Sequence, residues 1–302
     1  MNRLAIVIPY YKIDFFEETL KSVADQTDQR FTLYIGNDAS PSDPLPLIQK
    51  YFKEDEYRYF NYIKNIGGKN LALQWERVLE NVTEDWFQIL GDDDAIAENF
   101  VEEFYNNIGK FKSVVRFNRK TLNDKNVIIR EDKIVQDSIS SVDLFINGYS
   151  GLTVTSLTEF IFKTTQFKKY KFEKIDLAWG TDVIAFMQFS DFKNIQIINS
   201  TEVYIKVTEK SITGNNSSLK TKKDLAFNHF RKILLEKHAK FLPSEVIEKL
   251  IRDYHTTSIC YGKLTELNLW KIYLKRWKLI SFFKKNYRQY QVNKTIFGKN
   301  RI

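Results

Sequence analysis

The sequence predicts an α/β fold, with a Rossmann-like, mostly parallel central sheet flanked by helices and followed by a C-terminal helical extension. Over residues 1–100, short β-branched apolar runs alternate with stretches of helical periodicity. This alternation is typical of parallel strands joined by helical crossovers. From Leu225 onward the periodicity is helical throughout. Because 43% of the 302 residues are hydrophobic and 15% aromatic, the chain can build a substantial core.

The first crossover unit begins directly at the N-terminus. LAIVIP at 4–9 is a continuous apolar run, which predicts a strand buried on both faces. Phe16, Leu20 and Val23 follow at helical spacing, so we expect a helix there. A second short strand, at 31–35, ends in the turn-forming letters GNDAS.

Two more units complete this half. We expect a polar helix near 44–53, a third strand at 57–63, and a helix that opens at NIGGKN, residues 65–70. Leu71 begins its apolar positions. WFQILGDDD at 86–94 predicts a fourth strand that stops at three consecutive aspartates.

Residues 112–210 are less regular. Expected strands are 113–117, 127–129, 159–163 and 195–205, the first two forming a hairpin around Asn123-Asp124, and expected helices are 141–147 and 182–189.

Charge is divided unevenly along the chain. Residues 220–302 hold 20 Lys/Arg and 6 Asp/Glu, which leaves 26 and 32 for the rest. An acidic body joined to a basic tail suggests two parts with different partners. The single cysteine, Cys260, fits a reducing compartment. No segment reaches the roughly 20 apolar residues of a spanning helix, so we expect a cytoplasmic protein, free or peripheral to a membrane.

Acidic side chains follow two of the predicted strands. Asp38 comes after the second, and Asp92, Asp93 and Asp94 come after the fourth. This edge is where open α/β sheets bind ligands. Three adjacent carboxylates repel one another unless a cation compensates them, and Mg²⁺ or Mn²⁺ would do so while leaving positions for phosphate oxygens. The alternative is a solvated loop whose last aspartate caps the next helix.

Four motifs in order resemble the inverting glycosyltransferases of family 2, which have the GT-A fold and include enzymes of bacterial surface-polysaccharide assembly. The motifs are IVIPYY, GNDAS, NIGGKNLAL and ILGDDDAI. The resemblance implies a GT-A catalytic domain at 1–213, with a nucleotide-sugar half at 1–100 and an acceptor half at 101–213. A loop or linker at 214–224 and a basic aromatic helical region at 225–302 would follow.

The resemblance also implies roles for single residues. Pro9 and Tyr10 would lie at the edge of the nucleotide pocket. Asp38 would hydrogen-bond the base, although an aspartate in NDAS is also a common turn residue. Lys12 and Asn37 depart from the family's usual asparagine and aspartate.

Asn65, Gly67 and Lys69 match the segment beside the ribose and diphosphate. A lysine there supplies a point charge for phosphate, and glycines permit close backbone approach. The alternative is an ordinary loop before a helix.

In the acidic motif, the resemblance makes Asp94 the preferred ligand of Mn²⁺ or Mg²⁺. Asp92 would contact sugar or ribose, and Asp93 would belong to the same donor site.

An inverting transfer needs a general base for the acceptor hydroxyl. In the family this base begins a helix well after the acidic motif, and LAWGTDVIAF at 177–186 is the best match. Asp182 is then the base, with Thr181 in place of the usual glutamate. The alternative is that Asp182 only caps or begins the helix.

VYIKVTEKSIT at 203–213 resembles a later family segment that carries a histidine, here replaced by Thr208. Lys206 or Lys210 would compensate as a diphosphate contact.

The expected function is metal-dependent inverting transfer of a sugar from a nucleotide-diphosphate donor, a UDP-sugar by resemblance, to a glycan or lipid-linked acceptor. The basic aromatic tail, rich in Trp, Tyr and Phe, suits an anionic membrane surface or packs as an ordinary helix. The alternative function is a catalytically silent GT-A scaffold or nucleotide-binding protein that docks at the membrane through this tail. Nucleic acid is not an expected partner, since the body is acidic.

Overall fold

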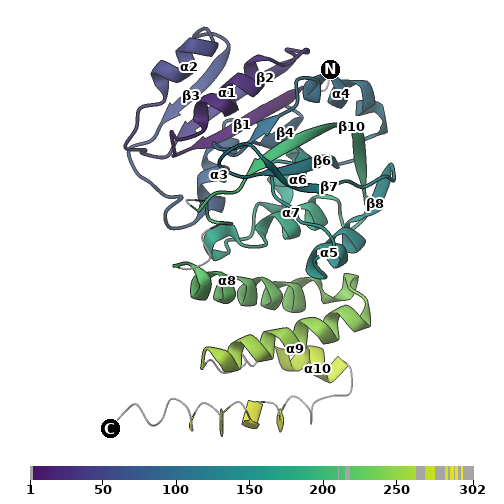
Figure 1. The fold of residues 1–302 in the computed structure, drawn as a ribbon. Coiled ribbons are helices and arrows are strands. Elements are labelled where there is room, and N and C mark those ends of the chain that lie inside the picture. The colour runs from purple at the N-terminus through teal and green to yellow at the C-terminus, as the bar shows by residue number, and fades with distance from the viewer. Residues whose placement is uncertain are drawn as a thin grey trace. The chain divides into compact units, whose positions relative to one another are not determined.

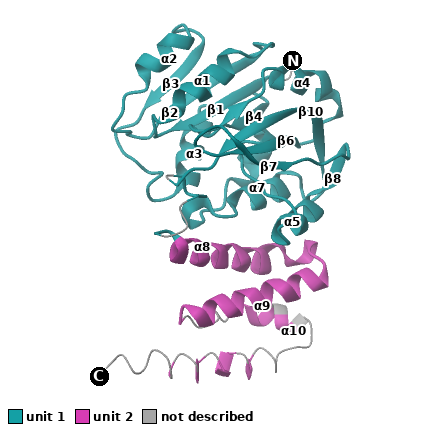
Figure 2. Ribbon diagram, in the orientation of Figure 1, with its two compact units in different colours: residues 1–219 teal, residues 220–302 magenta. Residues whose placement is uncertain are grey.

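The computed structural model describes residues 3–209, 211–214, 218–262 and 269–275, together with 283–284, 286–288, 290–291 and 294. The chain divides into two compact units, Met1–Leu219 and Lys220–Ile302, which Figure 2 shows in separate colours.

Unit 1 is built on one sheet of ten strands within the described residues (Figure 1). Its main path runs β3-β2-β1-β4-β9-β6-β10-β5, with β7 added to β6 and β8 to β10. The strands are β1 (Leu4–Tyr10), β2 (Phe31–Asn37), β3 (Tyr57–Asn61), β4 (Trp86–Ile89), β5 (Ala95–Ile96), β6 (Val114–Leu122), β7 (Ile128–Asp132), β8 (Ser138–Ser140), β9 (Phe160–Lys163) and β10 (Asn194–Lys206).

The α/β fold class is confirmed, but the expectation of a mostly parallel sheet holds only for part of it. Strands β3, β2, β1 and β4 are parallel, as are β6 and β10. Strand β9 runs antiparallel to both β4 and β6, and β5, β7 and β8 are also antiparallel to their partners. For β7 the reason is its connection to β6, a tight turn in which the Asn123 N–H donates to the Val127 carbonyl, because a hairpin cannot join parallel strands.

Helices cover both faces of the sheet. Side chains alternate between faces along a strand, so Trp86 packs on Phe104 of one helical layer while Phe87 packs on Phe167 of the other. The first layer holds α1 (Phe16–Ala24), α2 (Leu45–Tyr51) and α4 (Phe100–Asn107); the second holds α3 (Leu71–Leu79), α6 (Thr164–Tyr170) and α7 (Thr181–Phe189). Helix α5 (Ser141–Tyr149) packs on α7.

Two local features explain the centre of this unit. All seven residues of β1 are buried, as expected for an apolar strand that lies between two parallel neighbours and beneath two helical layers. Helix α3 approaches β2 so closely that a Cβ at Gly36 would lie 2.2 Å from Val78 Cγ2. Glycine at this position therefore sets the distance between α3 and the sheet.

The described residues of unit 2 are largely helical, as predicted. It contains α8 (Lys220–Ile233), a π-helical turn (Leu234–His238), α9 (Ser244–Cys260) and α10 (Trp270–Lys275). Helix α8 begins inside the segment 214–224 that was expected to be a loop, and an ion pair of 2.9 Å between Lys220 and Asp224 supports its first turn. Among the described residues, no helix is both long and apolar enough to cross a membrane.

Candidate active site

The carboxyl ends of the parallel strands meet at one edge of the sheet, and the predicted site residues follow these ends. The Asp38 N–H donates to the Tyr10 carbonyl over 3.0 Å, which ties the loop after β2 to the end of β1. On the other side of β1, the acidic run after β4 binds the backbone of Tyr11. Three segments that are distant in sequence therefore share this edge.

Asp92 anchors the acidic run to the loop after β1. Its Oδ2 accepts hydrogen bonds from the backbone N–H groups of Tyr11 and Lys12, both at 2.7 Å. Burial and the neighbouring charge of Asp93 raise the pKa of the Asp92 carboxyl to about 7, although both N–H donors favour the ionised form. Asp92 therefore holds the loop after β1 against the acidic run after β4.

Asp94 is the most enclosed of the three aspartates, with 7% of its surface exposed. Its Oδ1 accepts the Lys206 N–H at 3.0 Å, and its Oδ2 accepts the Thr158 hydroxyl. Burial and the charge of Asp93 raise the pKa of the Asp94 carboxyl. Strand β10 and the turn before β9 thus hold this carboxylate in place.

Gly91 leaves space between the Asp93 and Asp94 carboxylates. A Cβ at Gly91 would lie 2.8 Å from Asp94 Oδ2 and 3.2 Å from Asp93 Oδ1, so both oxygens border the same gap. Burial raises the pKa of Asp93, an effect that the charges of Lys12 and Lys206 oppose. No three His, Cys, Asp or Glu side chains of the described residues form a complete metal site. Two carboxylates are nevertheless sufficient for a cation that takes its other ligands from phosphate and water, as Mg²⁺ commonly does.

Asp38 is 1% exposed, and its carboxylate is fully engaged. It accepts the backbone N–H groups of Ile66 and Gly67, the latter at 2.7 Å, and pairs with the Arg77 guanidinium. Arg77 in turn lies 3.6 Å from the centre of the Tyr62 ring. In this arrangement the carboxylate holds the loop that begins at Asn65, and the expected contact with a base stays a prediction.

The loop Asn65–Lys69 lies over Asp38 and leads into α3. Asn65 Oδ1 accepts the Gly68 N–H at 2.7 Å, and Asn70 caps the helix by accepting the Ala72 N–H. A Cβ at Gly67 would lie 2.8 Å from Asp38 Oδ2, so glycine is needed for this approach. Lys69 is exposed.

Pro9 and the Tyr10 side chain are buried and do not line the edge of a pocket. The Tyr10 ring is 0% exposed, packs on Phe16 with ring centres 4.5 Å apart, and donates its hydroxyl to the Ser42 carbonyl. The alternation along β1 turns this side chain into the core, so only the backbone at this position reaches the site.

Lys206 reaches the acidic run through its backbone. Its ammonium pairs with Glu18 and lies 4.0 Å from the centre of the Phe15 ring, and the residue is 5% exposed. The expected phosphate contact therefore conflicts with the ion pair that the side chain already makes. Lys210 lies outside the described residues.

Asp182 lies in the first turn of α7, where Gly180, with φ of +87°, occupies the N-cap position. Its Oδ2 accepts the Thr155 hydroxyl at 2.7 Å. Burial, with the charge of Glu159 as a smaller cause, raises the pKa of the Asp182 carboxyl to about 6. A carboxyl group with this pKa is suited to accept a proton near neutral pH.

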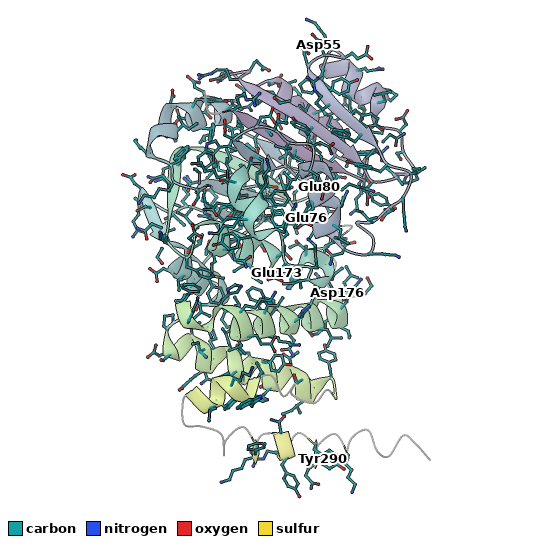
Figure 3. The ribbon with its side chains drawn as sticks, turned by 180° about the vertical axis from the view of Figure 1, so that it is seen from behind. Asp55, Glu76, Glu80, Glu173, Asp176 and Tyr290 are labelled. Atoms are coloured by element: carbon teal, nitrogen blue, oxygen red, sulfur yellow. The ribbon has the colours of Figure 1, made fainter. Side chains whose placement is uncertain are left out.

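The segment before Asp182 is strained and firmly held. Leu177 and Ala178 have φ values of +57° and +51°, a conformation that costs about 1–3 kcal/mol for each non-glycine residue. Glu76 of α3 accepts the Phe172 N–H at 2.8 Å, and Figure 3 shows Glu76 with Glu173 and Asp176 of this segment. Strain of this kind persists where the surroundings impose it, as at functional sites.

Sequence reasoning missed the polar residues that hold the site together. Glu159, 0% exposed, binds the guanidinium groups of Arg116 and Arg119 at 2.9 and 3.0 Å. Thr155 and Thr158 come from the same turn as Glu159. Two arginines within the apolar strand run SVVRFNRK were a usable signal, because a buried arginine requires a carboxylate partner. The threonines of VTSLT, residues 154–158, lie in no sequence pattern that would mark them as site residues.

Comparisons with known proteins agree with this fold. The family model described as glycosyl transferase family 2 matches residues 5–195. The chain therefore belongs to glycosyl transferase family 2, as its sequence predicted.

Similar individual proteins are more distant. A teichoic acid poly(glycerol phosphate) polymerase of Staphylococcus epidermidis is 28% identical over 127 residues, which are 39% of this chain and 17% of the polymerase. The DNA primase small subunit PriS of Methanococcus maripaludis is 27% identical over 138 residues, 41% of this chain and 34% of that protein. The chain thus spans much less than two thirds of either curated relative.

Among solved structures, S. aureus TarS 1–349 in complex with UDP-GlcNAc superimposes with a TM-score of 0.62 and 14% identity, covering 86% of this chain and 73% of that 1–349 chain. This likeness confirms the GT-A fold.

Proposed function

We propose that the protein is a metal-dependent, inverting glycosyltransferase that moves a sugar from a nucleotide-diphosphate donor, of the UDP-sugar class, to a glycan or lipid-linked acceptor in surface-polysaccharide assembly. The observation that carries the proposal is the pairing of two carboxylate sites. The acidic run after β4 and Asp182 at the start of α7 are both hydrogen-bonded to the turn that precedes β9. The crystallised relative bound to UDP-GlcNAc supports the choice of donor class.

On the donor side, Asp93 and Asp94 would hold the cation, Mn²⁺ or Mg²⁺, across the gap above Gly91. The cation supplies charge that neutralises the departing diphosphate. Lys69, exposed just before α3, adds a positive charge for the phosphates. Asp38 and Arg77 hold the loop that carries Lys69.

On the acceptor side, Asp182 acts as the general base. The acceptor oxygen bonds to the anomeric carbon while the bond from that carbon to the diphosphate oxygen breaks, and the hydroxyl proton passes to the Asp182 carboxylate. Attack opposite the leaving group inverts the configuration. The pKa of about 6 keeps this carboxylate ionised near neutral pH but basic enough to take the proton.

Calorimetric titration of UDP into the protein, with and without Mn²⁺, tests the donor site. We expect binding that requires the metal. Absence of such binding would favour the alternative of a catalytically silent scaffold, and a screen for nucleotide release across UDP- and GDP-sugars would then separate donor identity from loss of function.

Turnover should depend on pH through Asp182. The group must be unprotonated to act, so kcat/KM should fall about tenfold per pH unit below about pH 6 and level off above about pH 7. A rate profile from about pH 5 to about pH 8 at saturating Mn²⁺ measures this limb. A midpoint near 4, the ordinary value for aspartate, would contradict the assignment.

Gly91→Ala should weaken metal-dependent UDP binding. The new Cβ would lie 2.8 Å from Asp94 Oδ2 and must displace it from the gap. We expect a loss of about 10–100-fold in Mn²⁺-dependent affinity, the size seen when groups that orient metal ligands are disturbed. Gly109→Ala is the matched control, because a Cβ there meets no atom within 4 Å.

We further propose that the basic aromatic region 225–302 binds an anionic lipid surface. Exposed aromatic side chains recur along it, at Trp270, Phe283, Tyr287 and Tyr290, among the lysines and arginines of the tail. Such a composition favours a lipid headgroup layer. The full chain should sediment with vesicles containing phosphatidylglycerol and be released at about 0.5 M salt, where charges are screened. Equal binding to neutral vesicles would contradict the electrostatic part.

A further inference from the structure

The turn Thr155–Glu159, which precedes β9, contacts both proposed carboxylate sites. Thr155 binds Asp182 and Thr158 binds Asp94 through their hydroxyl groups. The two threonine Cα atoms are three residues apart and so cannot be separated by more than about 11 Å. One short piece of backbone therefore connects the acceptor side of the site to the donor side.

The Thr158 hydroxyl has a fixed orientation. Its oxygen accepts the Gly91 N–H at 3.4 Å, while the hydroxyl donates to Asp94 Oδ2. Thr158 is 3% exposed, so water does not compete for these bonds. The hydroxyl thus joins the beginning and the end of the acidic run.

The Thr155 hydroxyl orients the proposed base. It donates to Asp182 Oδ2 at 2.7 Å, and the backbone N–H groups of Val183 and Asp182 itself also hydrogen-bond the carboxylate. Glu159 is the charged side chain that acts on Asp182, and Glu159 is itself paired with Arg116 and Arg119. The charge near the base is therefore fixed as well.

The turn itself is clamped on both sides. Gln88 of β4 donates its side-chain amide to the Thr158 carbonyl at 2.7 Å, and the Phe117 N–H of β6 donates to the Glu159 carbonyl at 2.9 Å. The Ser156 N–H closes the turn on the Glu159 carboxylate. Two neighbouring strands thus hold the turn in one position.

We infer that Thr155 and Thr158 are positioning residues that fix the Asp182 and Asp94 carboxylates relative to each other, and so align the acceptor hydroxyl with the donor. The inference rests on the proposed function, since the residues it positions are the base and the cation ligand of that reaction. Both threonines are proposed to act through these carboxylates.

Valine and serine variants of the full chain test this inference. Valine keeps the shape and removes the hydroxyl, whereas serine keeps the hydroxyl. Thr155→Val should lower kcat at least about tenfold while Mn²⁺-dependent UDP affinity changes less than about twofold, and Thr158→Val should lower that affinity about 10–100-fold. Serine at either position should restore most of the loss. Thr153→Val is the matched control, since the Thr153 hydroxyl donates to the carbonyl of the adjacent Val154, away from both carboxylate sites.

Two readouts do not depend on turnover. Calorimetry of UDP with Mn²⁺ reports on Thr158, and ¹³C NMR titration of the Asp182 carboxyl reports on Thr155, because loss of a donor raises the pKa of a carboxyl group. An Asp182 midpoint unmoved by Thr155→Val, or serine variants as impaired as the valine variants, would overturn the inference. Suppose instead that the wild-type protein turns over no donor, while Thr158→Val lowers the UDP affinity and Thr155→Val raises the Asp182 pKa. That result would overturn the proposed function alone.

Discussion

Asp182→Asn is expected to lower kcat by about 10²–10⁴-fold, the range that a positioned general base contributes. Asparagine matches the shape of aspartate and can still accept the Thr155 hydroxyl through its carbonyl oxygen, but it cannot take a proton. Mn²⁺-dependent UDP affinity should stay unchanged, because Asp182 is hydrogen-bonded on the acceptor side of the turn and the acidic run is held separately.

Asp143→Asn is the matched control for this variant. Asp143 occupies the first turn of α5 as Asp182 occupies that of α7, so both changes remove a similar interaction with a helix N-terminus, worth about 0.3–1 kcal/mol. If Asp182 only begins its helix, both variants should keep full turnover. A turnover loss confined to Asp182→Asn, in a variant that remains folded, identifies the base.

Asp94→Asn is expected to reduce Mn²⁺-dependent UDP affinity at least about 100-fold. The change removes a charged ligand of the metal, which should cost more affinity than disturbing a group that only orients a ligand. The amide can retain the bond from the Lys206 N–H, so the fold should persist. Turnover should fall with affinity at low Mn²⁺ and recover in part when the metal is raised.

Asp55→Asn is the control for Asp94→Asn. Asp55 is exposed in the turn before β3 and is labelled in Figure 3. Calorimetry on both variants separates a local loss of metal affinity from a general effect of charge. Unchanged affinity in Asp94→Asn, with loss in Asp93→Asn, would remove Asp94 from the ligand set and leave Asp93.

The sequence predicted the site best where polar residues directly follow a recognisable strand. The apolar run at β1 predicted a strand buried on both faces, and its loops carried the motifs that place Asp38, Asp92 and Asp94 at one edge. The end of a strand can be identified from the local sequence. Because parallel strands joined by crossover connections end at the same edge of the sheet, that edge can be predicted as well.

Side-chain pairing was harder to predict because it depends on packing. Asp38 was expected to face a base, yet Arg77 and the backbone of Gly67 occupy its carboxylate. Lys206 was expected to face phosphate, yet it pairs with Glu18. Periodicity places a residue on a face of the sheet but does not specify which of several nearby charges it meets. The antiparallel course of β9 was missed for a related reason, since it depends on long-range pairing.

The enclosed group of Arg116, Glu159 and Arg119 also limits how this protein can change over evolutionary time. Arginine does not lose its charge at any ordinary pH, so loss of Glu159 would leave two buried cations that no protonation change can relieve, at a cost of about 3–5 kcal/mol. That is a large fraction of the 5–15 kcal/mol that holds a typical domain together. Divergence at these three positions should therefore proceed by concerted replacement, while the exposed loops around the acceptor side are free to vary one residue at a time.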